Sequence, residues 1–165
     1  MYPQSKSFSR KFLTAKFVLL SVISLQPATA ASEEIYYGSR AGMSATVVSK
    51  SGIGTANAVI RVEHLPKNAK AYCVEYEQDN SMACVRRTMV DVKIPDRVSG
   101  NCTKKTWSDL SGRSYAFLGR HKAGDFAPDY AIKHALSGEI LDGSSASGYG
   151  EALSVFQALC PGIAK

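Results

Sequence analysis

Long apolar segments are missing from this chain of 165 residues. The longest apolar run, Phe17 to Leu25, is far shorter than the about 20 residues that a membrane-spanning helix needs. Hydrophobic residues make up 45% of the chain and charged residues 21%, a balance that excludes a disordered or collagen-like protein. We therefore expect one small soluble domain without a membrane span.

Motifs for metal and nucleophile chemistry are missing as well. The four cysteines include no CxxC pair, and the three histidines form no HExxH or other i, i+4 pair. These absences argue against a zinc site and against metal-dependent hydrolysis. The serine-rich stretch 143–148 (GSSASG) does not fit the G-x-S-x-G motif of hydrolases. We expect no metal and no cofactor.

The first thirty residues have the three-part order of a secretory signal peptide. Basic residues precede the apolar run, Pro27 follows it, and Ala28-Thr29-Ala30 forms a small-x-small cleavage site. We therefore expect residues 1–30 to be removed, and residues 31–165 to form a single disulfide-stapled domain that is periplasmic or secreted.

Removal of this segment changes the charge of the protein. The whole chain has a formal net charge of +6 and a pI of about 9.2. Four basic residues and no acid lie in residues 1–30, so the remaining chain has a net charge of only +2. The basic pI therefore does not support a nucleic-acid partner, and we expect none.

All four cysteines lie in residues 31–165, and an even number in an exported chain indicates disulfides. Of the three possible connectivities we favour Cys73–Cys84 with Cys102–Cys160. Period-two alternation over residues 72–77 predicts a strand, and a hairpin turning at residues 78–79 would place Cys73 opposite Cys84. Alternatively, Ser81 caps a helix over residues 82–92. The pattern leaves both open.

The remaining pattern predicts an α+β fold. Residues 43–48 and 58–62, residues 107–118, and residues 130–134 with 139–141 have the composition of three hairpins. At the end, Tyr149, Leu153, Phe156 and Cys160 share one helical face. We expect a small antiparallel sheet or open barrel of hairpins, with a C-terminal helix pinned to it by the Cys102–Cys160 disulfide.

Basic residues are concentrated in residues 80–122, which hold nine of them against three acids. This region predicts a non-enzymatic exported protein that binds an anionic envelope polymer or a protein partner. The alternative is that these residues are only solvated strand edges and loops. The predicted binding residues are Arg86, Arg87, Lys104, Lys105, Trp107, Arg113 and Arg120.

Two other functions remain open. Residues 145–149 (SASGY) resemble the loop motif of bacterial lysozyme inhibitors of the membrane-bound and periplasmic C-type family, in which a Ser-Gly loop and a nearby Tyr enter the lysozyme cleft. That resemblance implies an inhibitor or immunity-type protein that uses residues 143–149. In this chain Tyr149 follows Gly148 directly, and the match is confined to this loop. A small exported hydrolase would instead use His121 or His134, with Asp125 and Asp129 near the former in sequence.

Overall fold

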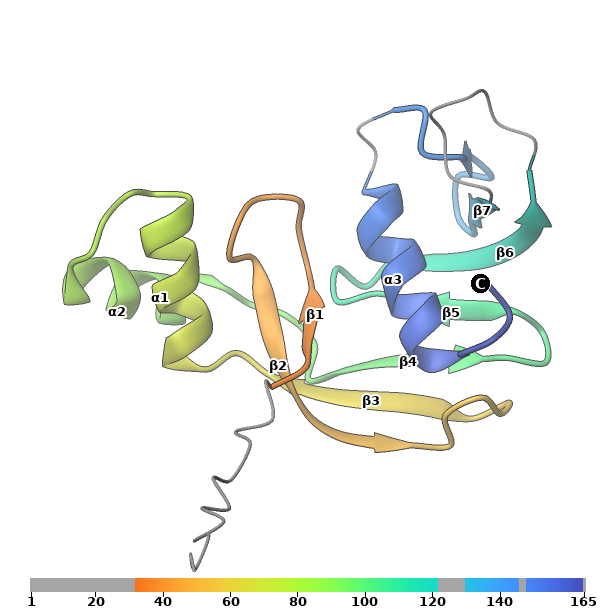
Figure 1. Ribbon diagram of the computed structural model, residues 1–165, viewed down its shortest axis with the longest axis horizontal. Coiled ribbons are helices and arrows are strands. Elements are labelled where there is room, and N and C mark those ends of the chain that lie inside the picture. The colour runs from red at the N-terminus through yellow and green to blue at the C-terminus, as the bar shows by residue number, and fades with distance from the viewer. Residues whose placement is uncertain (1–31, 122–129, 146–147, 165) are drawn as a thin grey trace, which may run out of the picture. The chain divides into compact units, whose positions relative to one another are not determined.

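The structure, a computed structural model, describes residues 32–121, 130–145 and 148–164. The predicted signal peptide and its cleavage site lie outside these residues. Within the described part, eight strands form one sheet and three helices accompany it (Figure 1). The strands are β1 (Glu34–Tyr36), β2 (Ser44–Ser51), β3 (Ala58–Glu63), β4 (Arg97–Asn101), β5 (Thr106–Ser108), β6 (Ser114–Arg120), β7 (Tyr130–His134) and β8 (Ile140–Leu141). The helices are α1 (Pro66–Glu75), α2 (Met82–Asp91) and α3 (Tyr149–Leu159).

Every strand pairs antiparallel with the strands next to it in the chain. The three predicted hairpins are confirmed as β2–β3, β5–β6 and β7–β8. Among the described residues β1 and β8 do not pair with each other, so the sheet stays open. Strand β3 illustrates why the sheet forms, because Ala58, Ile60 and Val62 are buried while the residues between them are not.

Helix α3 covers one face of the sheet, and the predicted apolar stripe is the face that it buries. Tyr149, Leu153, Phe156 and Cys160 are all buried in the main core, where Phe156 lies 4.6 Å from Trp107 and 4.9 Å from Phe117 between ring centroids. The Cys102–Cys160 disulfide joins the end of α3 to the end of β4, as predicted. The α+β fold with a disulfide-pinned C-terminal helix is therefore confirmed.

The region around the first disulfide differs from the favoured expectation. Residues 66–75 and 82–91 form two helices inserted between β3 and β4, so the strand prediction for residues 72–77 is wrong. Pro66 occupies the first turn of α1, where its missing N–H costs no hydrogen bond. The helical alternative after Ser81 is confirmed, because the Ser81 hydroxyl accepts a hydrogen bond from the Cys84 N–H at 3.2 Å.

The predicted Cys73–Cys84 pairing is confirmed, but it joins α1 to α2 and not two strands. The apolar cluster between these helices contains only Ala69, Cys73, Cys84 and Val85 as buried members. A cluster of this size stabilises little by itself, so the disulfide has a structural role here. The two disulfides together fit an oxidising compartment. No helix among the described residues is long and apolar enough to cross a membrane.

Candidate functional site

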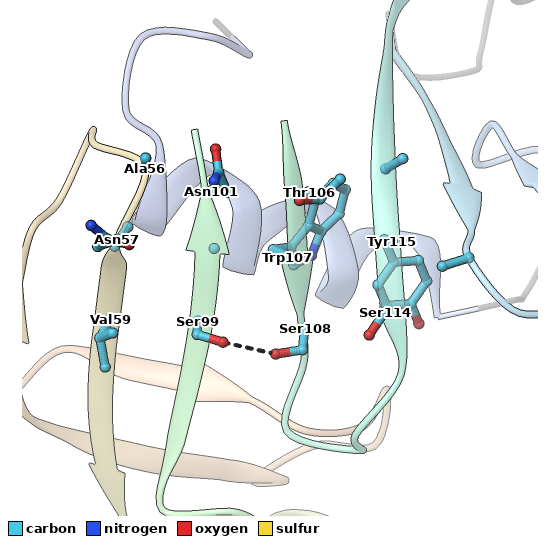
Figure 2. A pocket seen from close by; sticks show the side chains of 14 residues that line it. Ala56, Asn57, Val59, Ser99, Asn101, Thr106, Trp107, Ser108, Ser114 and Tyr115 are labelled. Carbon is cyan, nitrogen blue, oxygen red and sulfur yellow. Dashed lines mark hydrogen bonds between the residues drawn. The ribbon is translucent and has the colours of Figure 1, made fainter. Parts of the chain in front are cut away.

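A shallow groove of about 530 Å³ lies on the face of the sheet that α3 does not cover. Figure 2 shows this groove from outside, with the strands β3 to β6 in front of the helix. The groove exists because the outward positions of these strands carry small side chains. Inward positions such as Ile60, Val98 and Tyr115 fill the core instead. The candidate site is therefore a product of strand alternation.

The strand register arranges the outward side chains in two rows across the sheet. The first row consists of Val59, Ser99, Ser108 and Ser114, and the second of Asn101, Thr106 and Ala116. Within the first row, the hydroxyls of Ser99 and Ser108 lie 3.2 Å apart in a hydrogen bond (Figure 2). The floor of the groove thus presents hydroxyl and amide groups on a nearly flat surface, and it is accessible to a ligand that forms hydrogen bonds.

Cationic residues lie beyond the two rows in both directions along the strands. At one end Arg61 is paired across the sheet with Arg97, and both form ion pairs with Asp96 at 3.0 Å and 2.9 Å. These hydrogen-bonded guanidinium groups lower the pKa of the Asp96 carboxyl, so the carboxylate stays ionised and offsets one of the two charges. At the other end Lys104 and Lys105 form the exposed turn between β4 and β5.

The groove lacks the groups that acid–base catalysis requires. None of its described lining residues is Asp, Glu, His or Cys. The one titratable side chain, Tyr115, donates its hydroxyl to the Asp109 carboxylate at 3.1 Å and is almost fully buried. Burial, and then the negative charge of Asp109, raise the pKa of Tyr115 to about 12. Its hydroxyl is therefore protonated at neutral pH and is engaged inside the protein.

The predicted basic residues do not form one surface. Lys104 and Lys105 lie at the Asn101 end of β4, whereas Arg86 and Arg87 lie on α2, which connects to the opposite end of β4 (Figure 1). Arg113 precedes β6 and donates to the Ser111 hydroxyl at 2.7 Å. Arg120 ends β6, with its guanidinium 5.9 Å from the centroid of the Tyr130 ring. The two lysines lie in the turn that joins two lining residues of the groove, Asn101 and Thr106.

The predicted stacking role of Trp107 does not agree with its position. The side chain is only 3% exposed, and its ring packs between Tyr115 and Phe156 in the core. Strand alternation explains this, because Trp107 occupies the inward position between the outward Thr106 and Ser108. A ligand on the outer face would meet the two small neighbours and not the indole ring.

Arg61, Arg97 and Lys133 were not predicted as binding residues from the sequence, and neither were the small residues of the floor. Lys133 is exposed and pairs across the sheet with Ala116, beside the second row. The signal was present in the alternation of β4 to β6, where Ser, Thr, Asn and Ala occupy every other position. It becomes visible only when the register shows that these positions share a face.

The loop that resembles lysozyme inhibitors has a different environment here. The side chain of Tyr149 is buried, and its hydroxyl donates to the carbonyl oxygen of Tyr130 at 2.7 Å. Tyr149 is therefore part of the core and is not presented to an enzyme cleft. Residues 146–147 of the same loop lie outside the described residues.

The two histidines predicted as catalytic alternatives lie apart. His121 Nε2 is 3.8 Å from Asp142 Oδ2, and the Ser144 hydroxyl donates to the other oxygen of Asp142 at 2.6 Å. The hydrogen bonds from Ser144, and then the nearby His121, lower the pKa of Asp142. The Asp142 carboxylate lies between Ser144 and His121, so the histidine does not activate the Ser144 hydroxyl as a nucleophile. Asp125 and Asp129 lie outside the described residues.

His134 is held in the β7–β8 turn. Its Nδ1 accepts a hydrogen bond from the Ser137 N–H at 3.2 Å, and its ring lies edge-on to Tyr115. These contacts are those of a turn-stabilising side chain.

Comparison of the chain with protein-family models, with curated proteins and with solved structures found no match.

Proposed function

We propose that this chain is a small exported binding protein without catalytic activity, which holds an anionic polymer of the cell envelope on the outer face of β3 to β6. The observation that carries the proposal is the pair of small polar rows with cationic residues beyond them at both ends of the strands. The floor offers hydrogen bonds and the ends offer charge, which is the combination that an extended polyanion with polar groups requires.

The charge distribution favours an anionic ligand over a neutral one. No carboxylate lies among the described residues that line the groove, and Asp96 at its end is already paired with both arginines. Lys104 and Lys105 are exposed, and neither forms an ion pair within the described part of the chain. Their charge is therefore available to a ligand, at a strength that salt reduces.

The shape of the groove favours a polymer over a small molecule. Its floor crosses four strands, a width of roughly 15 Å at the usual strand spacing. A small ligand is normally enclosed on most sides, whereas this groove is open along its length. An elongated ligand would contact several strands at once and would gain from many weak contacts.

Chromatography on immobilised heparin, used as a model polyanion, tests the proposal. We expect the protein to be retained and to elute at a lower salt concentration when Lys104→Ala and Lys105→Ala are combined. The matched control combines Arg86→Ala with Arg87→Ala, which removes the same charge from α2. We expect this control to elute close to the unmodified protein, because α2 is remote from the groove.

Two outcomes would contradict the proposal. One is equal loss of retention in both double variants, which would indicate a response to net charge alone. The other is unchanged retention in Ser108→Glu, since this substitution places a carboxylate in the middle of the proposed floor while leaving every lysine and arginine in place.

A further inference from the structure

A second surface of the protein is rich in tyrosine. Tyr36 and Tyr37 begin the turn between β1 and β2, and Tyr72 and Tyr76 lie on α1 and at its end. Two of these side chains are linked to the turn through Arg40. The guanidinium of Arg40, in the turn, lies 4.7 Å above the Tyr76 ring, which in turn stacks on Tyr72 with centroids 5.4 Å apart.

Two adjoining hollows of about 360 Å³ and 330 Å³ lie between this turn and the first turns of α3. Tyr36, Gly38, Ser39 and Glu151 line both of them. Tyr37 lines the second hollow and also a third of about 240 Å³, which reaches Tyr72. We call the four tyrosines, the turn 38–42 and three residues of α3 (Gly150, Glu151 and Ser154) the tyrosine surface.

The charges of the tyrosine surface differ from those of the sheet groove. No lysine is among the described residues that line these hollows. The cations that line the two hollows beside Tyr36 are Arg40 and Arg113, and two acids, Asp109 and Glu151, line the same hollows. Arg113 forms an ion pair with Asp109 at 3.4 Å, and Glu151 lines the same hollow as Arg40. A polyanion would therefore gain little here.

The composition resembles that of surfaces that bind proteins. Tyrosine and arginine are enriched at protein interfaces and lysine is depleted, and tyrosine with serine and glycine dominates binding loops that recognise many different proteins. The turn sequence Tyr36-Tyr37-Gly38-Ser39-Arg40 has this composition, and the hollows beside it provide places for a partner's side chains.

We propose that the tyrosine surface binds an uncharged peptide segment of a protein partner, with its side chains in the two hollows beside Tyr36. This binding is separate from the polymer groove and does not depend on it. The partner is a protein because the recognition groups are aromatic rings, arginines and a turn that contains glycine and serine. Its segment is uncharged because the two arginines and two acids that line these hollows leave no net charge.

Helices α1 and α2 form a helical hairpin, and this helical hairpin gives the tyrosine surface its rigidity. In the turn, the backbone N–H of Tyr37 donates to the carbonyl oxygen of Met43 at 3.0 Å, and the backbone N–H of Met43 donates to the carbonyl oxygen of Arg40 at 3.1 Å. Gly42 packs directly on α1, which the Cys73–Cys84 disulfide holds against α2. A loop held in its binding shape loses less entropy on association. The inserted hairpin thus acts as a support for the β1–β2 turn.

Selection from a phage-displayed library of random peptides on the full chain, produced with its own N-terminal segment and with both disulfides formed, tests this inference. We expect enriched peptides without net charge. Gly150→Trp fills the first hollow from an exposed helical position where an added Cβ meets nothing within 4 Å. We expect it to weaken peptide binding by about 30-fold, the scale of an interface hot spot.

Gly150→Ala is the matched control, because it leaves the hollow open at the same position and favours the helix. It should bind the peptides as the unmodified protein does, and so should the combined Lys104→Ala and Lys105→Ala variant. Tyr36→Ala and Arg40→Ala should each reduce binding.

Three outcomes would overturn the proposal. The first is no enrichment of peptides above an uncoated surface, and the second is unweakened binding of the enriched peptides to Gly150→Trp. The third is that an uncharged oligosaccharide binds in place of peptides, and that Gly150→Trp abolishes this oligosaccharide binding. The last would make the surface a glycan site.

Discussion

Gly42 in the β1–β2 turn packs directly against the backbone of Tyr72 in α1. A Cβ on Gly42 would lie 2.5 Å from the Cα of Tyr72, and the glycine has a φ of +74° that L side chains rarely adopt. No other residue fits this position without a shift of the turn or of the helix. The turn and the helical hairpin therefore depend on each other.

We predict that Gly42→Ala destabilises the protein by more than the roughly 1–3 kcal/mol that a positive φ alone costs. Gly54→Ala is the matched control, because Gly54 has a φ of +80° with nothing within 4 Å of an added Cβ. Urea unfolding of both variants measures the difference. Equal losses would mean that the contact with α1 contributes nothing.

Asn68 connects α1 to the sheet, and we predict that Asn68→Asp costs about 3 kcal/mol at neutral pH. Its buried amide accepts from Thr46 at 3.0 Å and donates to Glu34 at 3.2 Å. An aspartate would lose the donors and place a second carboxylate beside Glu34. Acidification should recover part of the loss by protonating the new group.

Unfolding in urea at about pH 7 and about pH 4.5 measures this effect. Asn80→Asp, at an exposed position between α1 and α2, is the control and should change little. A comparable loss in both variants, or none in Asn68→Asp, would show that the buried amide is dispensable.

We predict that the two disulfides stabilise different parts of the molecule. Replacing Cys73 and Cys84 with alanine should cost about 3 kcal/mol by loop entropy and should expose residues 66–91 to local opening. Replacing Cys102 and Cys160 should cost about 4 kcal/mol and weaken the whole sheet, since both lie in the main core. Amide hydrogen exchange distinguishes the two patterns. Loss of protection throughout the sheet in the first variant would refute the separation.

We predict that Tyr115 makes the protein less stable in alkali. Its pKa is raised to about 12, by burial and then by Asp109, so the folded state holds the phenolic proton more tightly than the unfolded chain does. The stabilisation is complete below about pH 10 and is lost as the pH rises toward 12. Tyr115→Phe removes this group together with its hydrogen bond to Asp109.

The variant should be about 1 kcal/mol less stable than the parent at about pH 8. The difference should shrink to near zero at about pH 11, where only the parent has the Tyr115 proton to lose. Urea unfolding at both pH values provides the measurement. A constant difference would mean that Tyr115 does not titrate in this range.

The hairpins and the C-terminal helix were predictable from local pattern, whereas the Cys73–Cys84 pairing was predicted from a strand hairpin that the structure does not contain. A hairpin is indicated by turn residues between two runs of strand-forming residues, and helix α3 is indicated by its apolar stripe. Both signals depend only on neighbours in the chain. The helical hairpin was harder, because Tyr72, Val74 and Tyr76 alternate as a strand would. In the structure these residues lie in helix α1 and at its end, and the buried side of this helix carries Asn68, Ala69 and Cys73. Tertiary packing overrode the local alternation.

The candidate sites were less accessible to prediction. Lys104 and Lys105 were found because they are adjacent in the sequence. Arg61 and Arg97 are far apart in the chain and become neighbours only through the pairing of β3 with β4. Trp107 was assigned to the surface because a single residue type does not indicate which face of a strand it occupies.

The absence of long apolar runs, the even number of cysteines and the local periodicity led by themselves to the prediction of a small disulfide-stapled α+β domain. These features depend on composition and local periodicity, which the chain carries before it folds. The tertiary structure alone decided that the basic residues separate, that the groove lies on the uncovered sheet face, and that four tyrosines gather around one turn. Strand register and the inserted helical hairpin bring distant residues together, and no local pattern encodes that geometry.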